Sequence, residues 1–539
     1  MRFGWRILVV VVLALLLRSV NLQTVPVWDW DEGGNIEYAR NIMEGRLEYF
    51  GRQYHFIAHP PLYFMLLAPL FKAFGATIMV LRSFSVVCSI VGLLLTYLIV
   101  RRVLDEDSAL LAALIYAISP ELIFWGRLGF ANNLLAVLAL ASMYLLLRFL
   151  DSKDEKELLC AAALAGLCPI TEYAGIVFPA TLAIAVYWHA PKHLLKSLVV
   201  SAAPLTVFTA IMLAFDSEGF LKDAAWHFGI YPLAIPAVIL GVLLFKRLSP
   251  MILRLFDRLY CGVGKETPAE LVVFLLLTVW SIVPFELITF YSGIMPSAIF
   301  GISLIGIFLI PKSTFRDVLF ASIASYGLIL VTLNRWDHIS IPLQHLVIFG
   351  SVFLIAKVKS YIRNQMPAYA MVLLILPLAA TLLADVEGFA LKGLCEIPQA
   401  EFAALNDFLN QRTSKDDIVV TYSYLAPGLK ATPAVFEVVM PYNGYTFAYV
   451  KRTYAEDEVK QNQSIRNIRY AVLPWDFVHN SRKNGFWTNV TAELERWPLV
   501  YELNTTRKPS EGIASSLLGI LGHPRSCESR YVVLENPRG

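Results

Sequence analysis

Apolar and polar residues form long alternating blocks over the first 384 of the 539 residues. A helix needs about 20 apolar residues to cross a bilayer, so blocks of this kind predict an all-α polytopic membrane domain, residues 1–384, with about 13 transmembrane helices. The expected spans are 7–22, 79–100, 107–124, 131–149, 157–170, 174–189, 197–214, 231–246, 269–290, 296–311, 317–333, 340–357 and 367–384. A large loop, 23–78, separates the first two.

The pattern changes after residue 384, where hydrophobic density falls and polar turns appear. A helical pattern at 398–411 is followed by strand-like runs at 417–424, 470–473, 499–503 and 531–534. This order predicts a small α/β or α+β domain over 385–539. Asn-x-Ser/Thr sequons at Asn462, Asn489 and Asn504 agree weakly with an extracytoplasmic place for it. Cys395 and Cys527 could form one disulfide there.

The basic residues near the predicted helix ends set the orientation, because short cytoplasmic loops are rich in Lys and Arg. With the spans above, one side of the membrane receives Arg2, Arg6, Arg101, Arg102, Lys153, Lys156, Lys192, Lys196, Lys246, Arg247, Arg254, Arg258, Lys265, Lys312, Arg316, Lys357, Lys359 and Arg363. The N-terminus is therefore expected to be cytoplasmic, and loop 23–78 and domain 385–539 to lie outside the cell (plasma) membrane. One long helix at 157–189, in place of two, would invert the later topology.

Composition agrees with a multi-pass membrane protein: 57% of the residues are hydrophobic, the mean hydropathy is +0.59, and 16% are charged against roughly 25% in soluble domains. A net charge of +3 without a clustered basic face excludes nucleic acid as a partner. The first apolar run follows Arg2 and Arg6 and lacks a small-residue cleavage site, so it is expected to be a retained helix, not a signal peptide.

The segment 27–64 concentrates residues that can do chemistry. It contains the acids Asp29, Asp31 and Glu32 and ends in the motif HPPLYF at 59–64. Asp31 could take the proton from an acceptor hydroxyl or amide as that group attacks, a general-base role. Alternatively, Asp31 caps a short helix that starts near Gly33, with Glu32 in its first turn. The acids alone leave both interpretations open.

Histidine and arginine residues on the same predicted face suggest an anion site. His59 could bind a phosphate or an acceptor, or could hold a divalent metal together with Glu32 and His55, although a structural His is the common alternative. Guanidinium groups bind phosphate oxygens through paired donors. The further candidates for donor-phosphate or substrate binding are Arg52, Arg127, Arg335, His338 and Glu172; snorkelling of the arginines to lipid headgroups is the alternative.

Three motifs together resemble a known family. The Asp31-Glu32 pair, HPPLYF at 59–64 and LRSFS at 81–85 resemble the polyprenyl-phosphate-dependent glycosyltransferases of the GT-C fold, and in particular the protein O-mannosyltransferases and the bacterial aminoarabinose transferases that modify lipid A. The likeness covers roughly residues 5–380 in layout, with the motifs within 27–190.

The resemblance implies roles for individual residues. Asp31 would be the catalytic base, and Glu32 would orient the acceptor or bind a metal. His59 would lie next to the donor phosphate, and Arg127 and Arg335 match cationic positions of the family, Arg335 more loosely. Two departures concern the donor contacts and the sugar. Asn132 stands where an acid is common, five residues after the arginine, and Glu172 stands where a lysine is often found.

The implied activity is inverting transfer of a sugar from a polyprenyl-phosphate donor to a protein, glycan or lipid acceptor at the external membrane face. Beyond the donor, the acceptor and the membrane lipids, the only expected cofactor is a possible divalent metal cation. An oligosaccharyl transferase is disfavoured, because LPWDF at 473–477 matches the WWDYG signature of those enzymes poorly. The alternatives are a polytopic transporter or flippase of lipid-linked sugars and a non-catalytic glycolipid-binding relative.

Overall fold

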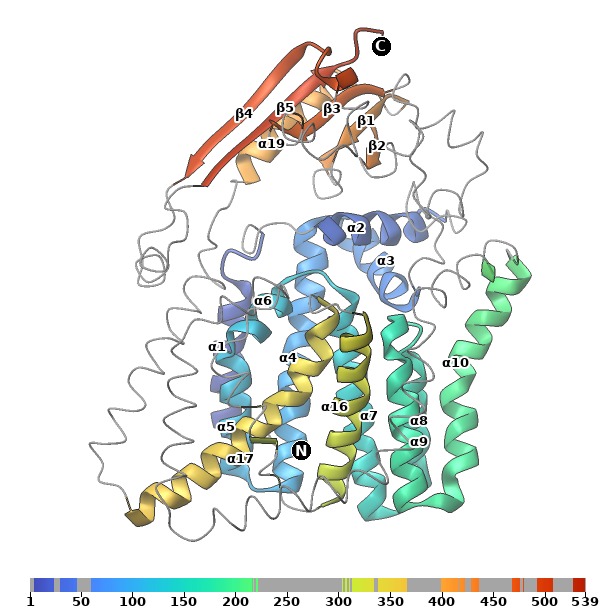
Figure 1. Cartoon of the computed structure of the whole chain (residues 1–539), viewed down its shortest axis with the longest axis vertical. Coiled ribbons are helices and arrows are strands. Elements are labelled where there is room, and N and C mark those ends of the chain that lie inside the picture. Colours follow the sequence, from blue (N-terminus) through green and yellow to red (C-terminus); the bar gives the residue numbers. More distant parts are fainter. Residues whose placement is uncertain are drawn as a thin grey trace.

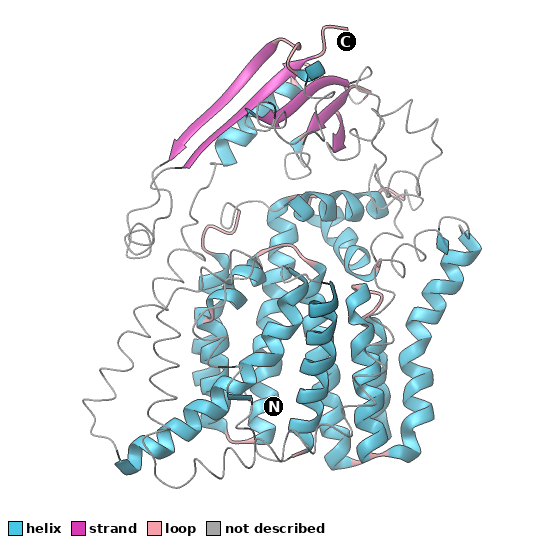
Figure 2. Ribbon diagram, in the orientation of Figure 1, coloured by secondary structure: helices cyan, strands magenta, loops and turns pink. Residues whose placement is uncertain are grey.

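The computed structural model describes the main part of the chain in segments. They are residues 4–23, 30–45, 60–215, 313–333, 338–365, 399–414, 416–421, 428–435, 468–475, 492–507 and 527–538, with isolated positions at 217, 220, 221, 303, 306, 307, 310 and 478. Figure 1 shows a helical bundle with a sheet domain at one end of it, and the N-terminus lies toward the other end. The all-helical and the mixed parts are separate in Figure 2. Which end faces the cytoplasm stays a prediction.

The described part of the bundle consists of α-helices and short 3-10 turns. They are α1 (Trp5–Ser19), α4 (Ile78–Val103), α5 (Glu106–Ile118), α6 (Pro120–Arg127), α7 (Ala131–Ser152), α8 (Glu155–Leu167), α9 (Val177–His189), α10 (Leu194–Phe215), α16 (Thr314–Leu333) and α17 (Ile341–Gln365), with short 3-10 turns η2 (Tyr173–Ile176), η3 (Pro191–His193) and η4 (His338–Ser340). Polar residues start several of them: the Asp105 side chain, for example, accepts from the Ser108 amide at 2.8 Å at the start of α5.

The expected number of spans is not confirmed. Within the described residues, three helical segments are long and apolar enough to cross a membrane: Ile78–Val103, Ala131–Ser152 and Pro191–Ala214. The expected span 107–124 is not one straight helix, because the chain bends by 61° between α5 and α6 at Pro120. The spans expected at 231–246, 269–290 and 367–384, and most of 296–311, lie outside the described residues.

The segment 157–189 forms two helices, as the orientation argument requires. Helix α8 ends at Leu167, and α9 begins at Val177 after a turn that contains Thr171 and Glu172. Apolar side chains on the outside of the bundle remain open: Trp5 on α1 is 73% exposed and Leu195 on α10 is 76% exposed. Such surfaces are stable against lipid hydrocarbon, which agrees with a bundle that lies in a membrane.

Helices α2 (Trp30–Met43) and α3 (Leu62–Phe74) come from the predicted external loop and lie at the sheet-domain end of the bundle (Figure 1). Ile36 and Ala39 on α2 are fully buried, while Asp31 and Glu44 are exposed. Helix α3 was not expected from hydropathy, because its 13 residues are too few to span a bilayer. The loop therefore contributes its own packed layer to the fold.

The C-terminal part forms a five-stranded mixed sheet with strand order β2-β1-β3-β5-β4. Its elements are α19 (Gln399–Asn410), β1 (Ile418–Thr421), β2 (Thr432–Val435), β3 (Ile468–Pro474), β4 (Leu499–Arg507) and β5 (Cys527–Glu535). Strand β1 is parallel to β2 and β3, and β5 is antiparallel to β3 and β4. Phe402, Leu405 and Leu409 of α19 pack on one face of the sheet, and Leu494 and Trp497 pack on the other. The expected α and β elements are present, and β2 is an addition.

Candidate active site

Two adjacent acids begin α2 in opposite surroundings. Helix α2 starts at Trp30, so Asp31 and Glu32 both lie in its first turn, where the positive end of the helix favours carboxylates. Asp31 is exposed, whereas the side chain of Glu32 is completely buried. The helix does not start near Gly33, as the capping interpretation of Asp31 required. Of these two carboxylates, only that of Asp31 is exposed.

Glu32 is held by Arg82 of α4. Arg82 Nε donates to Glu32 Oε1 at 2.8 Å, and Arg82 Nη2 donates to Oε2 at 2.6 Å. Both side chains are fully buried. A buried carboxylate is stable only when it is paired and hydrogen-bonded, and this two-point contact supplies both conditions. The pair fixes the first turn of α2 to the bundle.

The turn between α6 and α7 provides a second attachment for α2. The amide of Gly129 donates to Glu32 Oε1 at 2.7 Å, and the Asn35 side-chain amide donates to the Gly129 carbonyl at 2.7 Å. A Cβ on residue 129 would lie 2.3 Å from two carbon atoms of Leu81. Only glycine allows this close approach, so the α2 contact depends on the residue type at 129.

The residues that follow the HPP sequence pack within the fold. Tyr63 and Phe64, in the first turn of α3, are buried, and the Phe64 ring lies 5.2 Å from that of Tyr38 on α2. The amide of Leu62 donates to the carbonyl of Ile170 at 3.0 Å. This bond brings the start of α3 to the turn between α8 and η2. His59 itself lies outside the described residues.

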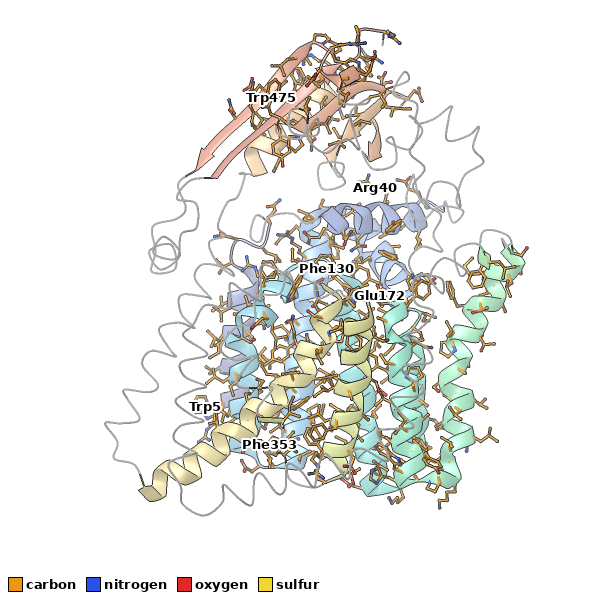
Figure 3. All side chains as sticks on the ribbon, in the orientation of Figure 1. Trp5, Arg40, Phe130, Glu172, Phe353 and Trp475 are labelled. Carbon is orange, nitrogen blue, oxygen red and sulfur yellow. The ribbon has the colours of Figure 1, made fainter. Side chains whose placement is uncertain are left out.

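Glu172 lies in that same turn. Its carboxylate accepts from the amide of Tyr173 at 3.1 Å and caps η2. Figure 3 shows Glu172 and Phe130 at the end of the bundle that α2 covers, with Arg40 on α2 itself. The structure therefore brings Glu172 to the same end as Asp31. Its proposed contact with substrate stays a prediction.

Arg127 is buried between helices. Its Nη1 donates to the carbonyl of Leu17 at 2.9 Å, and its Nη2 donates to that of Val20 at 2.5 Å. Both carbonyls belong to the C-terminal end of α1, where peptide carbonyls lack helical partners. The guanidinium thus joins α6 to α1, and these contacts are with protein backbone.

The other predicted site residues cannot be placed. Four of them lie outside the described residues: Arg52, His55, His59 and Arg335. For His338 the structure describes the backbone, in η4, but not the side chain.

The described residues contain no group of three His, Cys, Asp or Glu side chains that could hold a metal. Both oxygens of Glu32 accept from Arg82, and Oε1 also accepts from the Gly129 amide. The expected metal role of Glu32 with His55 and His59 stays a prediction, because both histidines lie outside the described residues.

The sequence interpretation gave no role to Arg82, Asn35 or Gly129. One signal was present for Arg82, because an arginine near the start of an apolar span is costly unless it is paired. Asn35 and Gly129 carried no such signal. Their contact joins residues 94 positions apart in the chain, and only the folded structure shows it.

A protein-family model and several solved structures are similar to this chain. Residues 58–215 match the family model described as dolichyl-phosphate-mannose-protein mannosyltransferase. The oligosaccharyltransferase of Archaeoglobus fulgidus tethered with an acceptor peptide is similar in structure, with a TM-score of 0.55, 14% identity, and coverage of 92% of this chain and 72% of that chain. The chain has the GT-C fold. Residues 58–215 resemble the protein mannosyltransferases, as the motifs at 59–64 and 81–85 predicted.

Two further structures resemble this GT-C protein. The apo form of the same archaeal enzyme has a TM-score of 0.54 and 13% identity, covering 94% of this chain and 73% of that chain. ArnT of Cupriavidus metallidurans bound to undecaprenyl phosphate has a TM-score of 0.48 and 12% identity, covering 98% and 97%. No curated protein sequence matches the chain. The family-model match includes Arg82, Arg127 and Gly129 but begins after the acid pair of α2.

Proposed function

We propose that this GT-C protein is an inverting glycosyltransferase that moves a sugar from a polyprenyl-phosphate donor to a protein, glycan or lipid acceptor at the external membrane face. The observation that carries the proposal is the division of labour between two adjacent acids. Glu32 is buried and paired with Arg82, while Asp31 is exposed on the same helical turn. A rigid support under one accessible carboxylate is what a general base requires.

In the proposed reaction, Asp31 takes the proton from the acceptor hydroxyl or amide. The acceptor oxygen or nitrogen forms a bond to the anomeric carbon while the bond from that carbon to the phosphate oxygen breaks. Attack opposite the leaving phosphate inverts the configuration at the anomeric carbon. Cationic groups stabilise the charge that develops on the phosphate, and His59, Arg52, Arg335 and His338 are the candidates for this role.

For Glu32 and Arg127 we propose roles other than those that the sequence suggested. Both are buried, and their described contacts are with Arg82 and with backbone amides or carbonyls. We assign both residues to positioning: Glu32 fixes the turn that bears Asp31, and Arg127 fixes α6 to α1.

The archaeal relative supports a lipid-phosphate donor. The Archaeoglobus fulgidus enzyme has also been solved in complex with an inhibitory peptide and a dolichol-phosphate, and this structure matches the present chain with a TM-score of 0.51 at 12% identity, over 92% of this chain and 72% of that one. A shared fold at this identity does not transfer the sugar or the acceptor. The donor class is therefore proposed, and the acceptor has to be found by experiment.

The test compares wild type with Asp31→Asn in nanodiscs that contain labelled polyprenyl-phosphate mannose or glucose and a membrane extract as acceptor. Wild type should transfer label, and Asp31→Asn should lose at least about 10²-fold in rate, the lower range for general-base catalysis. Asp107→Asn is the matched control, because Asp107 is 86% exposed in the first turn of α5 and pairs with Arg6.

The possible outcomes separate the alternatives. Equal transfer by wild type and Asp31→Asn would show that Asp31 is not the base. Absence of transfer by wild type over a panel of donors would favour transport or binding of the lipid-linked sugar. Equal loss in Asp31→Asn and Asp107→Asn would indicate damage to the fold and not to the chemistry.

A further inference from the structure

A further buried arginine lies on α1, next to Leu17, whose carbonyl Arg127 contacts. Arg18 is fully buried in the last turn of α1. Within the described part of the chain it makes hydrogen bonds to the Ser89 hydroxyl at 2.7 Å and to the carbonyls of Ala14, Ala117 and Tyr116 at 3.3, 3.0 and 3.1 Å. These acceptors are all neutral. An arginine in such surroundings is costly unless every donor has a use.

The carbonyls of Tyr116 and Ala117 need a donor because the helix breaks after them. In a continuous helix, the Tyr116 carbonyl would accept from the amide of residue 120, four positions on. Residue 120 is proline, which has no N–H, and the chain bends there by 61°. The guanidinium of Arg18 donates to both carbonyls and so completes the end of α5.

Arg127 likewise donates to carbonyls at a helix end, in this case the end of α1. It is the last residue of α6, beyond the break, and it donates to Leu17 and Val20 at the C-terminal end of α1. The C-terminal end of α5 thus receives the guanidinium of Arg18 from α1, and the C-terminal end of α1 receives that of Arg127 from α6. A positive charge at a helix C-terminus is also favoured by the helix dipole. We call the contacts of Arg18 and Arg127 with these carbonyls the arginine exchange.

The arginine exchange leads directly to the proposed base. Gly129 follows Arg127 by two residues, and its amide and carbonyl contact Glu32 and Asn35 of α2. We propose that Arg18 is a positioning residue that completes the broken end of α5, and that the exchange holds the turn between α6 and α7 where α2 docks. Its effect on transfer rests on the proposed function; its effect on the fold does not.

The test is a double-mutant cycle between Arg18→Met and Pro120→Ala in the full chain, in nanodiscs. Alanine at 120 restores an N–H that can reach the Tyr116 carbonyl, so it should replace part of what Arg18 supplies. Arg18→Met alone should lower the midpoint of thermal unfolding and reduce transfer about tenfold. In the Pro120→Ala background the same change should lower both quantities by clearly less, since contacting groups couple in such cycles.

Arg18→Lys separates charge from geometry. Lysine keeps the positive charge, but its compact ammonium lacks the planar fork that reaches Ser89 and the carbonyls together. We expect intermediate values for this variant. Arg102→Met is the matched control, because Arg102, in the last turn of α4, pairs with Asp151 of α7 at 2.6 Å and is 29% exposed; it should change neither quantity more than slightly.

Two results would overturn the inference. Additive effects of Arg18→Met and Pro120→Ala on the unfolding midpoint would show that the arginine does not complete the break at Pro120. Wild-type behaviour of Arg18→Lys would show that charge alone suffices. If wild type transfers no sugar, the unfolding cycle still tests the arginine exchange, so failure of the proposed function is distinguished from failure of this inference.

Discussion

Glu32 and Arg82 form an ion pair in which neither side chain has any exposed surface, with 2.6 Å between Oε2 and Nη2. Arg82 Nη1 also donates to the carbonyl of Leu22 beyond α1, at 2.9 Å. One arginine therefore joins the chain after α1 to the first turn of α2, while itself belonging to α4. The exposed Asp31 is adjacent to this junction, so its position depends on the pair.

Removal of one partner of the pair should be much worse than removal of both. Arg82→Met leaves the Glu32 carboxylate buried without its cation, which typically costs about 3–5 kcal/mol in the free energy of unfolding. The combined change Arg82→Met with Glu32→Gln leaves no buried charge, so it should unfold at a higher temperature than Arg82→Met alone. Thermal unfolding of the three proteins in one detergent checks the order.

Transfer should not recover in the same way. The double variant lacks the two-point contact that orients the first turn of α2, so we expect its transfer rate to stay at least about tenfold below wild type, as in misplacement of a catalytic group. A double variant that unfolds like Arg82→Met, or one with full transfer, would contradict the positioning role of the pair.

Gly129→Ala should disturb the same junction through sterics. The added methyl would meet Leu81 at 2.3 Å, and overpacking of this kind typically costs about 1–3 kcal/mol. We expect a lower unfolding midpoint and slower transfer. Gly327→Ala is the matched control, because a Cβ there meets nothing within 4 Å in α16.

A second change should rescue Gly129→Ala. Leu81→Ala removes the side chain that the new methyl would contact, so the double variant Gly129→Ala with Leu81→Ala should transfer sugar faster than Gly129→Ala alone. The measurement is the initial rate of label transfer, with each protein's folded fraction determined by size-exclusion chromatography. No rescue would mean that the close approach of residue 129 to Leu81 is not what requires glycine.

Local patterns in the sequence predicted the elements better than their contacts. The apolar blocks located α4, α7 and α10, whose length and apolarity agree with spans. The span at 107–124 was expected to be continuous because averaged hydropathy does not respond to one proline, although Pro120 removes a helical hydrogen bond. Strand β2 was missed because four residues that include Pro433 give almost no strand signal, and proline is accepted at an edge such as β2.

The candidate site was predictable only in part. The motif identified Asp31 and Glu32, but not that one would be exposed and the other buried, because neighbouring helical residues differ in surroundings only through tertiary packing. Arg127 was expected to meet phosphate, whereas its described bonds reach carbonyls of α1. A guanidinium serves both purposes with the same donors, so the sequence could not distinguish them.

The sheet domain contains an ion pair that should respond to acid. Burial opposes ionisation of Asp417, but hydrogen bonds from Ser414 and Arg469 outweigh it, so the pKa of Asp417 is lowered from its ordinary value. Arg469 Nη1 lies 3.0 and 3.1 Å from the two carboxylate oxygens, and this contact raises the pKa of Arg469. The pair links the start of β1 to the start of β3.

Because the folded-state pKa of Asp417 is depressed, its stabilising contribution is complete above the ordinary pKa of about 4 and is lost as the pH falls through the lower folded-state value. Asp417→Asn should therefore lower the midpoint of unfolding of the sheet domain at pH 6, and the difference from wild type should shrink steadily below about pH 4. Thermal unfolding of the full chain at each pH, monitored by protease cleavage within β1 and β3, measures this difference.

Asp416→Asn, which changes an exposed neighbouring carboxylate, should keep the wild-type response to acid. A difference between wild type and Asp417→Asn that stays constant from pH 6 to pH 2 would show that the Asp417 carboxylate is not stabilised by its charge.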